Sequence, residues 1–339
     1  GPDWRTKVPL ERGRNLGMRA DWKLASDNLV LWTNVIGDRE NGKTAPRAVI
    51  LRPMHRDLAT LFKLRLGFFV VLSAVLGWFM AVETMNIQTF LMLTLGGYAL
   101  TGASNGFNQI IERRVDGLMK RTRDRPLPTG RFSVKQALAW SLLAAAVGLT
   151  CLFRLNPLSG WLGVAAIVSY AFIYTPLKSK TSLSVFVGAI PGALPPMIGY
   201  VAATGDFGVE PGTLFAVQFM WQFPHFWAIA WLAHEDYAKA GYKLLPYNAG
   251  RTARSAQLIL LYTLFCIPAS MLPWALNQPM VGDVAFSVAV LAGLGFSWFA
   301  YQLLRELTLD AARRLMFASF VYLPVIQIVY VLDKIPLNP

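Results

Sequence analysis

The sequence predicts an all-α integral membrane protein built as a bundle of nine transmembrane helices. Three observations carry this prediction. Of the 339 residues, 55% are hydrophobic and only 15% are charged, whereas a soluble domain carries about 25% charged residues. Apolar stretches long enough to cross a bilayer recur from about residue 66 to the end. The basic residues lie almost entirely in alternate connections between those stretches.

The first 57 residues are polar and charged and lack a periodic apolar pattern, so we expect an irregular tail there. The chain begins with Gly1-Pro2 rather than Met, so part of this tail could be non-native. We place the membrane-embedded domain at residues 58–333 and a short C-terminal tail at residues 334–339.

Nine stretches have the length and composition of membrane spans. They cover residues 66–83, 89–107, 136–153, 157–174, 183–203, 212–233, 256–274, 281–302 and 315–332. With this count, every Lys and Arg except Arg154 and Lys334 falls on the side of the N-terminus. The positive-inside rule places that side in the cytoplasm. The net charge of +13 therefore reports topology and not a nucleic-acid surface.

Cysteine and histidine chemistry is sparse. The two cysteines, Cys151 and Cys266, both lie in apolar stretches, which excludes a disulfide scaffold and a cysteine-based metal site. The three histidines show no metal-ligand spacing. The longer, basic-side connections hold most of the polar residues, so we expect the chemistry at the cytoplasmic mouth of the bundle.

The first polar cluster follows the second apolar stretch and contains Asn108, Glu112 and Asp116. Four-residue spacing puts all three on one face of a helix. Hard oxygen ligands of this kind suit Mg²⁺, which is commonly completed by substrate phosphates. Arg121 and Arg125 follow, and guanidinium groups bind phosphate bidentately. The pattern favours a Mg²⁺–diphosphate site over a helix end with an ordinary basic loop.

The second cluster runs from Tyr174 to Lys180 and opens the next basic-side connection. Lys178 could reach a phosphate and Tyr174 could line a pocket, although such a pair is more often an interfacial anchor. Prolines and glycines within residues 188–199 predict a kinked helix that lines a cavity.

The third cluster lies in and after the sixth apolar stretch. His225 is ionisable within the stretch and is expected to face a cavity or to make a packing hydrogen bond. Trp221 and Phe226 could wall an apolar substrate, shield a carbocation with their ring faces, or contact lipid. Glu235 and Asp236 could hold a second Mg²⁺ or cap an exposed helix end.

Together these clusters resemble the UbiA superfamily of membrane prenyltransferases. Residues 108–126 look like its first acidic motif with a basic extension, and residues 174–193 look like its second conserved mouth. Residues 221–227 are similar to the haem-prenylating branch rather than to the quinone branch. The resemblance covers about residues 58–333 and implies a UbiA-type bundle with its active site at the cytoplasmic mouth.

The resemblance also implies roles for the first cluster. Asn108, Glu112 and Asp116 would hold Mg²⁺ and a prenyl diphosphate. Arg121 and Arg125 would contact the diphosphate.

Further roles follow for the other two clusters. Either Lys178 or Lys180 would meet phosphate from the second mouth. His225 would lie in the pocket that positions haem, and Glu235 and Asp236 would occupy the place of the second acidic motif.

The implied activity is transfer of the farnesyl group of farnesyl diphosphate to the 2-vinyl group of haem b, with addition of water. The expected product is haem O, and the expected cofactor is Mg²⁺. The expected location is a bacterial inner membrane rather than a mitochondrial one. The expected partners are the two substrates and the lipid bilayer, with haem A synthase or terminal-oxidase assembly as a further possibility and no nucleic acid. An aromatic quinone precursor is the alternative acceptor. A membrane anion transporter and an oxidase assembly factor are alternatives of other classes.

Overall fold

The structure is a computed structural model that describes residues 20–25, 28–33, 47–51 and 54–336. The chain divides into two compact units, Gly1–Thr60 and Leu61–Pro339. Helix α1 (Met54–Phe62) contains the boundary between them. The second unit carries every residue that the sequence analysis assigns to a site.

The first unit contains a three-stranded antiparallel sheet in the order β1-β2-β3. Its strands are β1 (Ala20–Ala25), β2 (Asn28–Thr33) and β3 (Arg47–Leu51). This sheet differs from the irregular tail that we expected. Each strand has only five or six residues, so a pattern sought over the length of a membrane span does not detect it. Short runs such as Leu29-Val30-Leu31-Trp32 nevertheless have the apolar and β-branched composition typical of strands.

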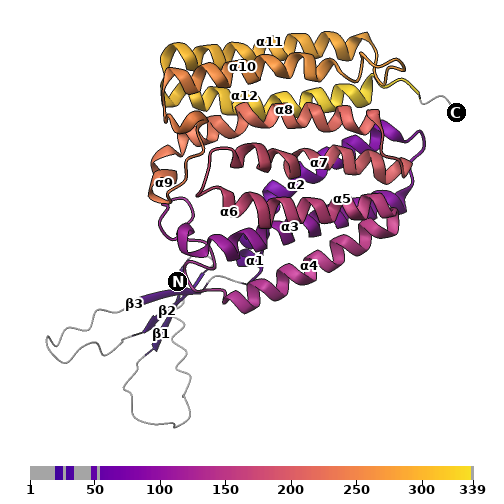
Figure 1. The fold of residues 1–339 in the computed structure, drawn as a ribbon. Helices are drawn as coiled ribbons and strands as arrows, with labels where there is room; N and C mark the ends of the chain where they lie inside the picture. Colours follow the sequence, from indigo (N-terminus) through magenta and orange to yellow (C-terminus); the bar gives the residue numbers. More distant parts are fainter. Residues whose placement is uncertain (1–19, 26–27, 34–46, 52–53, 337–339) are drawn as a thin grey trace. The chain divides into compact units, whose positions relative to one another are not determined.

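The second unit is helical, which confirms the all-α prediction for the membrane domain (Figure 1). Its long helices are α2 (Leu64–Ala81), α3 (Ile87–Asp116), α4 (Val134–Leu155), the run α5–η1–α6 (Pro157–Ile167, Val168–Tyr174, Thr175–Leu177), α7 (Ser184–Thr204), α8 (Val209–Leu232), α10 (Ala253–Met271), α11 (Asp283–Glu306) and α12 (Leu309–Leu332). The short elements α9 (His234–Lys239) and η2 (Pro246–Asn248) lie between α8 and α10. Each predicted span falls on one long helix or on the α5–η1–α6 run.

Within the described residues, seven helices are long and apolar enough to cross a membrane, so the protein is a multi-pass membrane protein. Helices α3 and α8 are not among the seven. Both carry buried polar side chains, such as Asn108 and Glu112 in α3 and Gln218 and Gln222 in α8, which make them less apolar than the others. The count of nine spans therefore stays a prediction. Both helices outside the seven bury polar side chains in the interior of the bundle.

Buried apolar side chains form two clusters. One joins α8, α10, α11 and α12 around residues such as Trp227 and Phe296. The other joins α2, α3, α5 and α7 around residues such as Trp78 and Phe107. Helix α7 lies between the C-terminal group of helices and the α3–α4–α5 group (Figure 1).

Helix α7 runs continuously through its three prolines and packs closely on α2. A Cβ atom at Gly199 would collide with the carbonyl oxygen of Ala74, so the two backbones are in direct contact there. Pro196 has no N–H for the carbonyl of Gly192, one turn earlier. The side-chain amide of Gln218 on α8 donates to that carbonyl at 2.7 Å. Helix α8 thus satisfies the backbone carbonyl that Pro196 releases, as the apolar interior of a membrane requires.

Candidate active site

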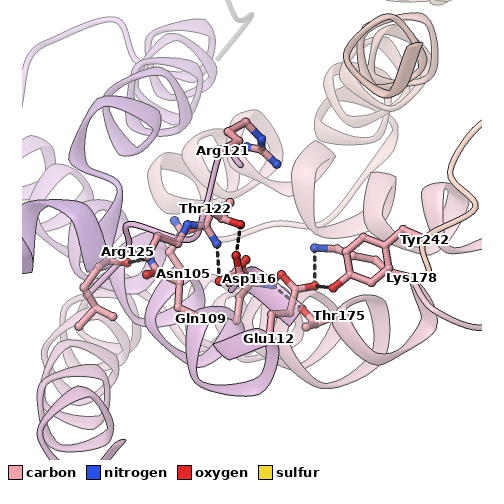
Figure 2. Close-up of polar contacts among 12 residues, drawn as sticks. Asn105, Gln109, Glu112, Asp116, Arg121, Thr122, Arg125, Thr175, Lys178 and Tyr242 are labelled. Atoms are coloured by element: carbon pink, nitrogen blue, oxygen red, sulfur yellow. Dashed lines mark hydrogen bonds and ion pairs between the residues drawn. The ribbon is translucent and has the colours of Figure 1, made fainter. Parts of the chain in front are cut away.

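The three residues of the first polar cluster lie along one face of the C-terminal part of α3, as their spacing predicts. Figure 2 shows two of them, Glu112 and Asp116. All are buried: the exposed fraction is 1% for Asn108, 6% for Glu112 and 0% for Asp116. Each carboxylate has a basic partner. We call Glu112, Asp116, Arg125 and Lys178 the acid–base cluster.

Glu112 is held by three groups from three parts of the chain. Lys178 Nζ lies 2.9 Å from its Oε1, and the Tyr242 hydroxyl donates to the same oxygen at 2.8 Å. The amide of Asn108 donates to Oε2 at 3.0 Å. Burial favours a neutral amine, but the Glu112 carboxylate raises the pKa of Lys178 above its ordinary value. The pair is therefore an ion pair at neutral pH.

Asp116 is held from the loop that follows α3. Arg125 Nη1 lies 2.7 Å from its Oδ2, and the Thr122 hydroxyl donates to its backbone carbonyl at 2.8 Å. Its other carboxylate oxygen, Oδ1, is buried and has no hydrogen-bond partner among the described residues. A buried oxygen of this kind carries a desolvation cost of about 1–3 kcal/mol unless a ligand meets it. The Asp116 carboxylate thus has one oxygen that is open to a ligand.

The donor set fits Mg²⁺. Glu112 and Asp116 offer carboxylate oxygens, and Asp116 Oδ1 is an open ligand position. Asn108 uses its amide N–H groups on Glu112 and on the Thr175 hydroxyl, which leaves its Oδ1 as an acceptor. No group of three or more His, Cys, Asp and Glu that could hold a metal occurs in the described part of the chain. The remaining ligands would therefore be water and substrate phosphate, which is usual for Mg²⁺.

A π-helical turn, η1, shapes the second mouth. The Thr175 hydroxyl donates to the Tyr170 carbonyl at 2.8 Å and accepts the Asn108 amide at 3.1 Å. The turn brings Tyr174 beneath Lys178, with Nζ 4.7 Å from the ring centre. Such turns inside α-helices occur frequently at functional sites. Lys178 pairs with Glu112 within the acid–base cluster, whereas Lys180 is exposed.

Lys63 belongs to the same site, although the sequence analysis did not single it out. It lies between α1 and α2 in the left-handed region, with φ 49° and ψ 54°. Burial and, to a smaller extent, the charges of Arg125 and Lys178 lower the pKa of Lys63 to about 7. The carboxylates of Glu112 and Asp116 act in the opposite direction. The ammonium group of Lys63 therefore lies within electrostatic range of the acid–base cluster. Its position just before the first apolar stretch is the signal that could have found it.

The second acidic pair divides between two tasks. Asp236 accepts the backbone N–H groups of Lys120 and Arg121 at 3.3 and 3.2 Å, so it fastens the loop after α3 to α9. Glu235 has a side chain that is 80% exposed and pairs with Arg251 at 3.1 Å. Among the described residues, neither the Glu235 nor the Asp236 carboxylate contacts Glu112 or Asp116.

Arg121 lies beside α9 and not within the acid–base cluster. Its guanidinium group donates to the Tyr237 hydroxyl at 3.4 Å and lies 5.8 Å from the centre of that ring. Arg125 is the arginine that contacts a carboxylate of the cluster. Figure 2 shows Arg121 apart from the Asp116–Arg125 pair.

The aromatic cluster lies where α8 meets α12. His225 Nδ1 is 2.8 Å from the Ser319 hydroxyl, and its ring stacks on Trp221 at 4.5 Å. Phe226 contacts the same ring edge-on at 5.8 Å. Both Trp221 and Phe226 are half-buried, in contrast to the fully buried Trp227. In this arrangement Nδ1 of His225 has a hydrogen-bond partner, and Nε2 has none among the described residues.

The chain belongs to the UbiA prenyltransferase family, because residues 68–322 match the model of that family. The bundle is thus that of a membrane prenyltransferase, and the resemblance inferred from the sequence is confirmed. Among similar proteins, the protoheme IX farnesyltransferase of Christiangramia forsetii is 48% identical over 82% of this chain and 93% of its own length. The protein of the same name from Cytophaga hutchinsonii is 47% identical over 81% of this chain and 96% of its own length.

Solved structures show the same fold at low sequence identity. A digeranylgeranylglyceryl phosphate synthase superimposes with a TM-score of 0.69 at 15% identity, covering 82% of this chain and 98% of its own. A UbiA homologue from Archaeoglobus fulgidus, bound to GPP and Mg²⁺, has a TM-score of 0.60 at 14% identity and covers 81% of this chain and 99% of its own. These similarities concern the fold.

Proposed function

We propose that this protein transfers the farnesyl group of farnesyl diphosphate to the 2-vinyl group of haem b, with addition of water, to give haem O and diphosphate. The observation that carries the proposal is the buried acid–base cluster with its open Asp116 oxygen, which suits a metal-bound diphosphate. Relatives at 41–48% identity over most of the chain are named protoheme IX farnesyltransferase, which supports the choice of donor and acceptor.

The cations of the site would act on the leaving diphosphate. Arg125, Lys178 and Lys63 would stabilise the negative charge that grows on it as the bond to farnesyl C1 breaks. Mg²⁺, held by Asn108, Glu112 and Asp116, would supply further charge neutralisation when bound. Ion pairs already hold Arg125 and Lys178 in place, so these two side chains would need little reorganisation during the reaction.

The chemical step balances without an oxidant or a reductant. The C1–oxygen bond of farnesyl diphosphate breaks, and the electron pair leaves with diphosphate. The terminal carbon of the vinyl group forms the new carbon–carbon bond to farnesyl C1. Water then adds to the adjacent carbon, which is cationic, and releases a proton to solvent. The protein would supply position, electrostatic stabilisation and exclusion of water until the carbon–carbon bond has formed.

We place the site at the cytoplasmic face of a bacterial inner membrane, with the N-terminus in the cytoplasm. The distribution of Lys and Arg supports this orientation. The farnesyl chain would then lie among the apolar helices, with its charged head at the mouth. The product is apolar and remains in the bilayer, which supports hand-over to a membrane partner such as haem A synthase or the machinery of terminal-oxidase assembly.

The test is a product assay on purified protein with haem b, farnesyl diphosphate and Mg²⁺, read by mass. The expected product carries one farnesyl group and one water, and it is lost when Mg²⁺ is chelated. Prenylation of a quinone precursor with haem unmodified would overturn the acceptor and retain the class. Absence of prenyl transfer to either acceptor would favour a transporter or an assembly factor.

Binding of the prenyl diphosphate is expected to weaken as pH rises through about 7, because Lys63 loses its proton there. Below that pH the Lys63 ammonium is charged and can bind phosphate directly. Above it, Lys63 is neutral and must take up a proton when the diphosphate binds. The change approaches tenfold per pH unit once Lys63 is neutral, about 1.4 kcal/mol. Calorimetric titration at pH 6, 7 and 8 measures it. Lys63→Arg keeps the charge and is the control, since its profile reports only the titration of the ligand; identical profiles would contradict the role of Lys63.

Replacing Asp236 by Ala is expected to raise the KM for farnesyl diphosphate roughly tenfold, because two backbone N–H groups of the loop after α3 lose their acceptor. Glu235→Ala is the matched control, since the exposed Glu235 pairs with Arg251 and has no other partner among the described residues. Steady-state kinetics on both variants decide the point. Equal effects would show that the loop does not depend on Asp236.

A further inference from the structure

The hydrogen bonds around His225 fix which of its ring nitrogens carries the proton. The Ser319 hydroxyl lies 2.8 Å from His225 Nδ1 and donates to the Met316 carbonyl at 2.5 Å. A serine hydroxyl has a single proton, and a carbonyl can only accept. Ser319 therefore accepts from the imidazole, and Nδ1 is the protonated nitrogen. The lone pair is on Nε2.

The ring is also fixed in orientation. It stacks on Trp221 with an angle of 15° between the planes, and Trp221 Nε1 donates to the Ser319 carbonyl at 2.8 Å. Phe320 meets it edge-on at 5.0 Å. The imidazole is only half-buried, and in the part of the chain that the structure covers Nε2 has no hydrogen-bond partner. A neutral imidazole with Nδ1–H bonded and Nε2 open has the form in which histidine binds metals.

The surroundings restrict which metal could bind. The contacts of the His225 ring are with the Ser319 hydroxyl and with aromatic rings, and the described residues hold no group of three or more His, Cys, Asp and Glu that could bind a metal ion. A free ion needs several protein ligands to be held. A metal whose other positions are already filled by a planar macrocycle needs only one. The neighbouring Trp221, Phe226 and Phe320 present aromatic surface, and Phe320 is 43% exposed.

We propose that His225 Nε2 binds the iron of the haem substrate as an axial ligand, with Ser319 orienting the imidazole through Nδ1. The proposal rests on the proposed function, in which haem b is the acceptor. His225 lies seven residues before the end of α8, about 10 Å along the helix from the mouth where α9 meets the loop after α3. Haem bound there would thus lie deeper along α8 than a diphosphate at the mouth.

The test is a titration of the full-length protein with ferric haem b, without farnesyl diphosphate, followed by absorption and electron paramagnetic resonance. We expect the spectrum of histidine-bound haem in the wild type. In His225→Gly this signature is lost, the affinity for haem falls at least about tenfold, and added imidazole restores the signature. Ser319→Ala keeps the signature and weakens binding about tenfold, as loss of a partner to a metal-bound histidine does. His234→Ala, the control at the mouth, keeps both.

Iron-free protoporphyrin IX separates ligation from packing. Its affinity is expected to be the same in the wild type and in His225→Gly, because it has no iron for Nε2 to bind. An equal loss for both porphyrins, or a lost signature that imidazole does not restore, would mean a structural role and overturn the proposal. An unchanged haem spectrum in His225→Gly would do so as well. If the wild-type protein farnesylates haem and the haem spectrum is the same in His225→Gly, only this inference fails. If the wild-type protein neither binds nor farnesylates haem, the proposed function fails.

Discussion

Replacing Asp116 by Asn is expected to lower the rate of farnesyl transfer by about 10²–10⁴-fold and to leave the protein folded. The change removes the charge that holds the metal but keeps the volume of the side chain. The amide oxygen can still accept from Arg125 where Oδ2 does now. The new N–H₂ group takes the position of Oδ1, which no donor among the described residues occupies. The folded state loses the charge of the Asp116–Arg125 pair but keeps its hydrogen bond, so the larger effect falls on catalysis.

Glu112→Gln is a harsher variant of the same experiment. Both oxygens of Glu112 accept from donors, Lys178 and Tyr242 on one and Asn108 on the other. An amide nitrogen at either position would face a donor, so this substitution costs stability as well as rate. Product formation by mass and thermal unfolding in detergent separate the two effects. Asp310→Asn, at an exposed pair with Arg313, is the control and should change neither. Near-normal turnover in Asp116→Asn would exclude it as a metal ligand.

The bundle could be predicted from the sequence because membrane spans are encoded locally. A span needs about 20 consecutive apolar residues, and the connections reveal their side by charge. The shared face of Asn108, Glu112 and Asp116 is equally local, since it follows from helical spacing. The short strands β1, β2 and β3 could not be found by the same means, because their length is far below that of a span.

The contacts that complete the site are not local. Tyr242 reaches Glu112 across 130 positions of the sequence, and Lys178 does so across 66. The left-handed conformation of Lys63 depends on how α1 meets α2, and nothing in a lysine predicts it. Asp236 and Glu235 are adjacent in sequence, yet one fastens a loop and the other pairs with Arg251. The spacing of the sequence predicts the acidic residues of the site, whereas tertiary packing determines which cations pair with them.

Replacing Lys178 by Met is expected to lower the free energy of unfolding by about 3–5 kcal/mol and to abolish activity, because it leaves the buried Glu112 carboxylate without its counter-ion. Lys180→Met is the matched control: the same substitution two residues on, at an exposed position, should be nearly neutral in both respects. Thermal unfolding and turnover of the two variants measure the difference. Equal behaviour would contradict the assignment of Lys178 rather than Lys180 to the site.

The double variant Glu112→Gln/Lys178→Met separates the structural role of the pair from its catalytic one. With the carboxylate neutralised, loss of the ammonium no longer strands a buried charge, so the double variant should be more stable than Lys178→Met alone. Activity should stay absent, because both a metal ligand and a cation for the leaving diphosphate are gone. If stability returned together with activity, the ion pair would serve only the fold. If neither returned, Lys178 would have a structural partner other than Glu112, and Tyr174 beneath its ammonium group is the residue that the geometry then indicates.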